Sequence, residues 1–273
     1  MTHCPECNFE FPVGLESYPP NCPRCGVPLN VPNTPPEPRP RVRINYAFLR
    51  YSPTLYIIVI CTLAFLAEVA VSRNLDPSVE AVYALGALNG PAIFAGQWWR
   101  MITSVFLHGG VVHIALNMWA LFNLGILAEI LYGRRNYIFL YLLCGLGGSA
   151  LSIFWHPDQV GIGASGAIFG IAGALLPALK FQKNPRLAQA LRGSFKSIGL
   201  FVIYNLLFGA VVPFIDNSAH LGGLITGIVT GYFLPSFTVE EERRQNGRAI
   251  AVFAIVFALI VALAAFAKRV HSS

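Results

Sequence analysis

Charged side chains are scarce in this sequence. Only 12% of its 273 residues are Asp, Glu, Lys or Arg, whereas 55% are hydrophobic, and the mean hydropathy is +0.58. A soluble domain usually carries about 25% charged residues. The shortage of charge therefore excludes an ordinary soluble domain and predicts an all-α, polytopic membrane protein. The net charge of +6 does not indicate a partner such as nucleic acid, because the basic residues lie in short stretches between apolar segments.

An apolar leader is also missing. The N-terminus is polar and contains four of the six cysteines within its first 25 residues, so it does not resemble a signal peptide. The other two cysteines, Cys61 and Cys144, stand alone in apolar segments and are typical of small packing residues. We therefore expect the chemistry of cysteine to be confined to the N-terminus.

The N-terminal cysteines form two Cys-x-x-Cys pairs. Cys4 and Cys7 are separated from Cys22 and Cys25 by 14 residues, a spacing typical of a tetrahedral, four-thiolate site for Zn²⁺. Two disulfides are the alternative, and they would need an oxidising compartment. The topology derived below places this end in the cytosol, so a zinc ribbon is favoured over two disulfides. The ribbon would comprise residues 1–30. Four protein ligands leave no open position, so Zn²⁺ would be structural and would take no part in catalysis.

Seven apolar segments follow a linker rich in Pro and Arg over residues 31–49. They lie at about 53–72, 113–132, 136–155, 165–180, 197–214, 218–236 and 249–267, and each has the apolar composition of a transmembrane helix. The first six would form a core over residues 50–236. Residues 237–273 would then hold a second linker and the seventh helix.

The basic residues give these helices a direction. When Lys and Arg are counted from residue 31 onward on alternate sides of the seven segments, 14 lie on the side of the N-terminus and four (Arg73, Arg100, Lys268 and Arg269) lie on the other side. Because Lys and Arg accumulate in cytoplasmic loops, the N-terminus is expected in the cytosol and the C-terminus outside. A compact chain of this kind favours a bacterial plasma membrane over an organelle.

The fourth segment is too short to cross the membrane. From Ser165 to Leu179 it has 15 residues, or about 22 Å of helix against a hydrocarbon core of about 30 Å. Lys180 and Lys183 would hold its far end at the cytosolic face, so Ser165 would lie below the outer surface. A helix end inside the bilayer is tolerated only where it faces protein or a water-filled cavity. We therefore expect a cavity that opens to the outside and has Ser165 at its floor.

Glycines surround this serine. Gly163 and Gly166 flank Ser165 and would leave its hydroxyl exposed, although a lone Gly-x-Ser-Gly is more often a simple helix cap. Two series recur at helical spacing and are expected to pack against each other: Gly163, Gly166, Gly170 and Gly173 in the fourth segment, and His220, Gly223, Gly227 and Gly231 in the sixth. Such packing would bring His220 within reach of Ser165 as a candidate general base.

Two further polar residues begin the second segment. His113 and Asn117 are four residues apart and share one helix face at its outer end. They could be a pair of helix-packing hydrogen bonds or part of a polar site, and the sequence leaves both possibilities open.

A carboxylate that could complete a catalytic triad is missing. Glu129 would lie about 24 Å deeper than His113, Asp216 is expected to cap the sixth helix, and Glu68 belongs to the end of the first segment. The residues thus predict a Ser–His pair. The absence of a buried charge relay argues against a transporter.

Five motifs in this order resemble the rhomboid family of intramembrane serine proteases. They are Trp99-Arg100, His108 with His113-x3-Asn117, Gly125-x3-Glu129-x3-Gly133, Gly163-Ala-Ser165-Gly166, and His220-Leu-Gly222-Gly223-x3-Gly227. The resemblance covers about residues 50 to 236 and implies a rhomboid-like six-helix core, to which the zinc ribbon and the seventh helix are additions.

The resemblance also implies roles. Ser165 would be the nucleophile, His220 the base, and the Ser165 N–H with the His113 and Asn117 side chains the oxyanion hole. Phe169 would stack on His220, at a position where many members have Tyr. Gly163, Gly166 and Gly223 would support the site, and Trp98, Trp99 and Arg100 would have structural roles in the first loop.

The implied activity is hydrolysis of transmembrane segments of other membrane proteins near the outer face. The expected partners are therefore transmembrane substrates and the lipid bilayer, together with an unidentified cytosolic partner of the ribbon. The alternative is a catalytically silent scaffold of the same fold that binds membrane proteins.

Reporter fusions test the predicted topology. Because of the bias in Lys and Arg, fusions at residues 134–136 and 183–194 should report a cytosolic location and fusions at residues 156–160 an external one. A cytosolic signal from a fusion near Asp158 would contradict the depth inferred for Ser165.

Overall fold

The chain forms two compact units that are divided after Arg41. The computed structural model describes residues 3–4, 6–11, 19–27, 49–181, 185–212, 214–234 and 246–271. The linker predicted over residues 31–49 lies outside the described residues except for Leu49. Residues 237–245, which belong to the second predicted linker, also lie outside them. The two units are described separately.

The N-terminal unit repeats one backbone turn around each cysteine pair. Cys4 donates its N–H to the Phe9 carbonyl (2.9 Å) and accepts from Asn8 (3.0 Å). Cys22 donates in the same way to Val27 (2.9 Å) and accepts from Gly26 (2.8 Å). Asn8 and Gly26 occupy the equivalent position in the two turns, and both have a positive φ, of 55° and 71°. The two turns therefore present their cysteines with the same backbone geometry.

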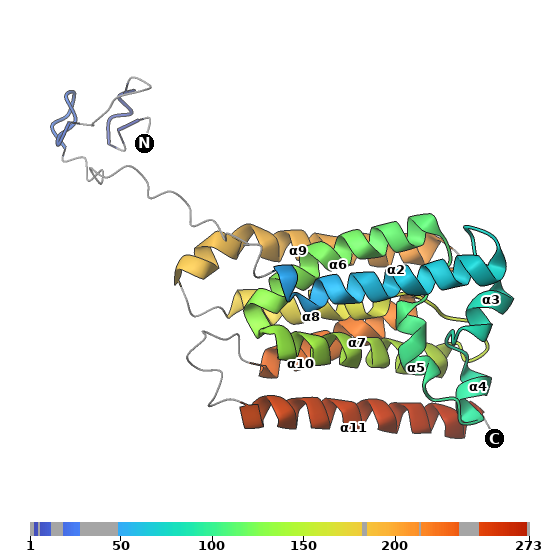
Figure 1. Cartoon of the computed structure of the whole chain (residues 1–273). Helices are drawn as coiled ribbons and strands as arrows, with labels where there is room; N and C mark the ends of the chain where they lie inside the picture. Colours follow the sequence, from blue (N-terminus) through green and yellow to red (C-terminus); the bar gives the residue numbers. More distant parts are fainter. Residues whose placement is uncertain are drawn as a thin grey trace. The chain divides into compact units, whose positions relative to one another are not determined.

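The second unit is a bundle of long helices with short helices at one end (Figure 1). The long ones are α2 (Pro53–Ser72), α6 (Val111–Tyr132), α7 (Arg134–Trp155), α8 (Ser165–Lys180), α9 (Pro185–Val211), α10 (Asn217–Phe233) and α11 (Asn246–His271). Between α2 and α6 lie α3 (Val79–Ala84), α4 (Gly90–Phe94), α5 (Arg100–Thr103) and the 3-10 turn η1 (Ser104–Phe106). Each of the seven predicted segments coincides with a long helix, and the predicted all-α fold is confirmed.

Not every long helix has the length of a membrane span. Within the described residues, five helices are long and apolar enough to cross a membrane, namely α2, α6, α7, α11 and the Gly193–Val211 part of α9. The chain is therefore a multi-pass membrane protein. The helix α8 is short, with 16 residues, as predicted. The helix α10 has 17 residues. Most side chains of α8 are buried, because α6, α7, α9 and α10 all pack against it.

Several helix ends lie together at one end of the bundle. The N-termini of α6, α8 and α10 and the C-termini of α7 and α11 lie at the end of the bundle where α3 and α4 are found (Figure 1). The Gly90 N–H of α4 donates to the Pro157 carbonyl after α7 (2.8 Å). We refer to this end as the outer end, following the topology predicted from the sequence.

The opposite end is held by Glu129 and Tyr132 of α6. The buried Glu129 carboxylate accepts hydrogen bonds from the hydroxyls of Ser52 (2.6 Å) and Thr54 (3.1 Å), where α2 begins. The Tyr132 hydroxyl donates to the Ala174 carbonyl of α8 (2.6 Å). Glu129 thus acts at the end of α6 that is remote from His113, as its position in the sequence indicates.

The closest helix contact is between α8 and α10, and it is made by glycine. A Cβ atom at Gly223 would overlap the Gly166 carbonyl, and one at Gly227 would overlap the Gly170 carbonyl. At Gly231, a Cβ atom would lie 2.6 Å from the Cα of Ala174. The predicted packing of the two glycine stripes is confirmed, with one correction. Gly163 is not part of the stripe, because it precedes α8 in a non-helical conformation with φ +123°.

Gly227→Ala tests this contact. The added methyl group would force the backbones of α8 and α10 apart, and we expect unfolding in detergent to become easier by about 1–3 kcal/mol. Gly199→Ala in α9 is the matched control, since a Cβ atom there meets no described atom within 4 Å. It should be neutral or slightly stabilising because Ala favours helix. Equal unfolding midpoints for the two variants would contradict the proposed packing.

Candidate active site

Ser165 stands at the start of α8, and the loop before it is tied to two other segments. Leu88 and Gly161 exchange two backbone hydrogen bonds (2.8 and 3.0 Å), and the Gly163 N–H donates to the Ser104 carbonyl (2.9 Å). Gly163 has no room for a side chain, because a Cβ atom would lie 2.9 Å from Cε1 and Nε2 of His113. A glycine is thus required at position 163 for two reasons: its positive φ and the close approach of the His113 ring.

The serine itself is partly exposed and begins a helix without a side-chain cap. The N-cap residue of α8 is Ala164, which cannot accept a hydrogen bond through its side chain. The first N–H groups of a helix lack intrahelical acceptors and carry partial positive charge. The Ser165 end of α8 can therefore stabilise a negative charge beside the hydroxyl.

His220 is placed one turn into α10. Asp216 caps this helix by accepting from the Ala219 N–H (2.9 Å), which confirms the role predicted for it. The other Asp216 oxygen accepts from the Ser152 hydroxyl of α7 (2.5 Å). Because the carboxylate is engaged in this way, it fixes the start of α10 rather than contacting the imidazole.

Phe169 brings His220 over the start of α8. The two rings are stacked, with centroids 4.2 Å apart and planes inclined by 8°. Phe169 lies one helical turn after Ser165, so the imidazole sits over the first turn of α8. His220 is 93% buried, and its Nδ1 has no hydrogen-bond partner among the described residues. The pairing of the imidazole with the Ser165 hydroxyl, without a carboxylate, stays a prediction.

His113 reaches the same place from α6. Its Nδ1 accepts the Gly109 N–H (3.3 Å), so the proton of the neutral ring belongs on Nε2. Nε2 is one of the atoms that crowd Gly163. Asn117 is buried and donates one amide hydrogen to the His113 carbonyl (3.0 Å), which leaves its second hydrogen available. Ser165, His220 and His113 thus converge from three helices, while Asn117 lies one turn further along α6.

Glu68 and His108 form a contact that the sequence did not predict. The fully buried Glu68 carboxylate of α2 accepts the His108 N–H with both oxygens (2.9 and 3.1 Å). The His108 ring is also buried, and it meets His113 edge to face with centroids 5.2 Å apart. A carboxylate in an apolar segment is itself a signal of function, but only the fold shows that it meets His108.

Arg100 secures the short helices at the outer end. Its buried guanidinium donates to the carbonyls of Tyr83 (2.8 Å) and Ala87 (3.0 Å) and lies over the Tyr83 ring. Its neighbours Trp98 and Trp99 are exposed, as expected for residues that face the membrane interface. These contacts agree with the structural role that the resemblance implies.

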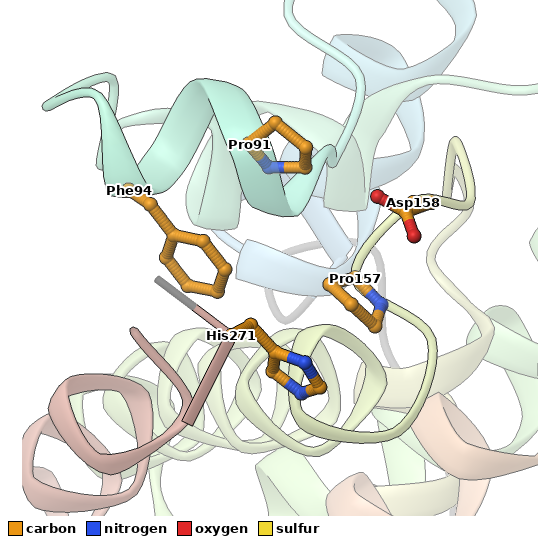
Figure 2. Close-up of a pocket in the computed structure, with 5 residues that line it drawn as sticks. All are labelled: Pro91, Phe94, Pro157, Asp158 and His271. Atoms are coloured by element: carbon orange, nitrogen blue, oxygen red, sulfur yellow. The ribbon is translucent and has the colours of Figure 1, made fainter. Parts of the chain in front are cut away.

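A separate pocket lies at the outer end between α4, the α7–α8 loop and the end of α11. It is lined by Pro91, Phe94, Pro157, Asp158 and His271 (Figure 2). His271 bonds through Nε2 to the Phe154 carbonyl (2.9 Å), and its ring lies parallel to that of Phe94. This pocket has no hydroxyl or thiol nucleophile among its described lining residues. It does show how α11 is attached.

The four N-terminal cysteines meet in a cluster that fits a metal. Their sulfur atoms all lie within 4.8 Å of one another, and none forms a disulfide. The Cys4–Cys25 and Cys7–Cys22 sulfur distances are 3.7 and 3.6 Å. A tetrahedron with metal–sulfur bonds of about 2.3 Å has edges of about 3.8 Å. The spacing is thus that of metal ligands rather than of disulfides, whose sulfurs are about 2.05 Å apart.

The thiols of this cluster differ in acidity: burial raises the pKa of the Cys7 thiol to about 12, whereas Cys22 is the acidic member. Burial acts to raise the pKa of the Cys22 thiol, but hydrogen bonds from the backbone N–H groups of Cys25 and Arg24 outweigh burial and lower the pKa to about 6. The thiolate is the form that binds metal.

The chain is similar to known proteins over its helical unit. Residues 95–237 match the model of the rhomboid domain. Rhomboid protease GluP of Bacillus subtilis is 39% identical over 174 residues, which cover 63% of this chain and 32% of that protein. RHOMBOID-like protein 5 of Arabidopsis thaliana is 30% identical over 238 residues, or 76% of each chain. Rhomboid-like protease 3 of Toxoplasma gondii is 29% identical over 177 residues, covering 64% of this chain and 66% of that one. The match to the Bacillus protein spans about a third of its length, but the family model and the Arabidopsis relative together show that this chain belongs to the rhomboid family.

Proposed function

We propose that this protein is an intramembrane serine endopeptidase in which Ser165 is the nucleophile and His220 is the general base. One observation carries the proposal: the Phe169 ring, one turn after Ser165, stacks on the His220 imidazole at 4.2 Å. A serine hydroxyl is a weak nucleophile until a base removes its proton. The names of the Bacillus and Toxoplasma relatives as proteases support the same reaction.

In the proposed reaction, the Ser165 oxygen attacks the scissile carbonyl while His220 takes the hydroxyl proton. The Nε2 atom would accept it, because Nδ1 is enclosed. The protonated imidazole then gives the proton to the leaving amine, and an ester remains on Ser165. Water hydrolyses this ester with His220 again acting as base, which restores the serine.

The negative charge that develops on the substrate oxygen would be bound by three donors. The Ser165 N–H belongs to the uncapped start of α8, His113 presents Nε2–H, and Asn117 retains one free amide hydrogen. Donors fixed in advance and shielded from bulk water are effective at stabilising such a charge. This arrangement favours a polar site over the simple helix-packing role that the sequence left open for His113 and Asn117.

We further propose that the substrates are transmembrane segments of other membrane proteins, cut near the outer face. Ser165 lies at the end of a 16-residue helix, or about 24 Å, that cannot reach across the bilayer, so the scissile bond must come to a recessed position. A substrate helix would have to unwind locally, which favours helix-breaking residues and a small residue before the cut. The proposed location is a bacterial plasma membrane, with residues 1–30 in the cytosol and the core at residues 50–236.

The catalytically silent scaffold is the second candidate. Inactive relatives usually lack the serine or the histidine, and this chain has both. The close placement of Ser165, His220 and His113 therefore favours the enzyme.

Replacing Ser165 and His220 separates the enzyme from the scaffold. Ser165→Ala and His220→Ala should each abolish nearly all cleavage of single-span substrates in liposomes, and the double variant should be hardly worse, because the two residues act as a unit. A fluorophosphonate should label wild-type Ser165, and this labelling should depend on His220. Cleavage by folded Ser165→Ala protein would contradict the mechanism. If the wild-type protein neither cuts nor is labelled, the scaffold is the correct reading.

The cysteine cluster is proposed to bind structural Zn²⁺. Purified full-length protein should contain one zinc per chain by elemental analysis, and the variant with both Cys4→Ser and Cys22→Ser should contain none. Because the site has four protein ligands, this variant should still cleave substrate. Cys61→Ser is the matched control and should retain the metal. Loss of cleavage in the folded double variant would contradict a purely structural role for the ribbon.

A further inference from the structure

The start of α6 has no side-chain cap. The N-cap residue of this helix is Gly110, which has φ +151° and no side chain that could accept a hydrogen bond. The segment that leads into α6 is held from outside through Glu68, a residue of α2. The Glu68 side chain is fully buried, and both of its oxygens lie within 3.1 Å of the His108 backbone nitrogen.

The next backbone N–H connects this anchor to His113. Gly109 donates to His113 Nδ1 at 3.3 Å. A ring nitrogen that accepts a hydrogen bond is unprotonated, so the neutral imidazole carries its proton on Nε2. Nε2 approaches Gly163, two residues before Ser165. The backbone of His108 and Gly109, through their two successive N–H groups, therefore joins the carboxylate of α2 to the orientation and the tautomer of His113.

The His108 side chain supports His113 from a second direction. Its Nδ1 lies 3.2 Å from the Phe106 carbonyl, and its ring packs edge to face on His113. The position of this ring depends on the backbone that Glu68 holds. A shift of His108 would thus move both groups that contact the imidazole of His113.

A carboxylate is an expensive means of satisfying one backbone N–H. A buried charge in an apolar segment costs free energy, and a neutral acceptor could make the same contact. Its advantage is that two equivalent oxygens accept the same N–H, at 2.9 and 3.1 Å, which fixes its direction. Such a bond matters where the group that it positions must be accurately placed.

We propose that Glu68 is a positioning residue for the oxyanion hole, and that it acts through the His108–Gly109 backbone to hold Nε2–H of His113 toward the reacting carbonyl. This inference rests on the proposed function and extends it to a residue on a helix that contributes no group to the reaction. Glu68 does not touch the substrate.

Three variants test the proposal in the full-length protein. Glu68→Leu removes the acceptor, Glu68→Gln keeps one oxygen, and Glu129→Leu removes a buried carboxylate at the far end of the bundle as the matched control. Cleavage of a single-span substrate in liposomes would be measured below the unfolding temperature of each variant and expressed per folded molecule. We expect Glu68→Leu to lower kcat by about 10-fold to 100-fold with KM nearly unchanged, because misplacing a transition-state donor acts on the chemical step. Glu68→Gln should recover most of the rate, and Glu129→Leu should lower stability but leave kcat unchanged.

A second readout does not depend on cleavage. Nitrogen NMR of protein labelled at histidine reports the tautomer of His113, with the His113→Gln spectrum identifying its signals. The wild-type protein should show only the form protonated at Nε2, and Glu68→Leu should show a mixture of tautomers. If the wild-type protein is inactive, the proposed function fails while this measurement still tests Glu68. A single tautomer in Glu68→Leu, or equal losses of kcat in Glu68→Leu and Glu129→Leu, would overturn the proposal.

Discussion

Backbone contact between α8 and α10 is the constraint on which the candidate site depends. Because Gly223 and Gly227 have no side chains, the two helices approach until carbonyl groups of one meet the Cα atoms of the other. Any Cβ in the contact would separate the axes, and Phe169 could no longer stack on His220 at 4.2 Å. In a membrane the hydrophobic effect contributes little to the association of helices, so close packing of this kind holds them together. The glycines thus set the distance between the helices that carry Ser165 and His220.

The second constraint is the short length of α8. Its 16 residues are covered by four neighbouring helices, which allows its uncapped N-terminus to stand inside the bundle and not in lipid. The loop before this N-terminus is held by two contacts at the outer end: the Gly163 N–H donates to the Ser104 carbonyl, and Gly161 pairs with Leu88. The segment from Ser104 to Gly110 therefore serves both the loop before Ser165 and the start of α6. A polar site can form here because its backbone donors are satisfied or directed into the site.

Much of this fold could be predicted from the sequence, because apolar length and glycine spacing are local signals. They gave the seven helices, the short fourth one and the packing of the two glycine stripes, and the Asp216 cap followed from its place before α10. The prediction that Gly163 belongs to the glycine stripe was wrong, because helical spacing in the sequence does not reveal that its φ is +123°. The contact of Glu68 with His108 joins residues 40 positions apart. Only the fold brings them together, so a sequence pattern could not identify that pair.

Three carboxylates of this fold hold the ends of helices. Glu129 holds the start of α2, Asp216 caps α10, and Glu68 holds the entry to α6. Each binds N–H or hydroxyl groups, and in the described residues none of them bonds to His220. An anion next to the imidazole would favour its charged form, whereas a base must be neutral before it takes a proton. Stacking on Phe169 orients the ring without adding charge. In the proposed mechanism, the developing negative charge would be stabilised by the start of α8 and by His113.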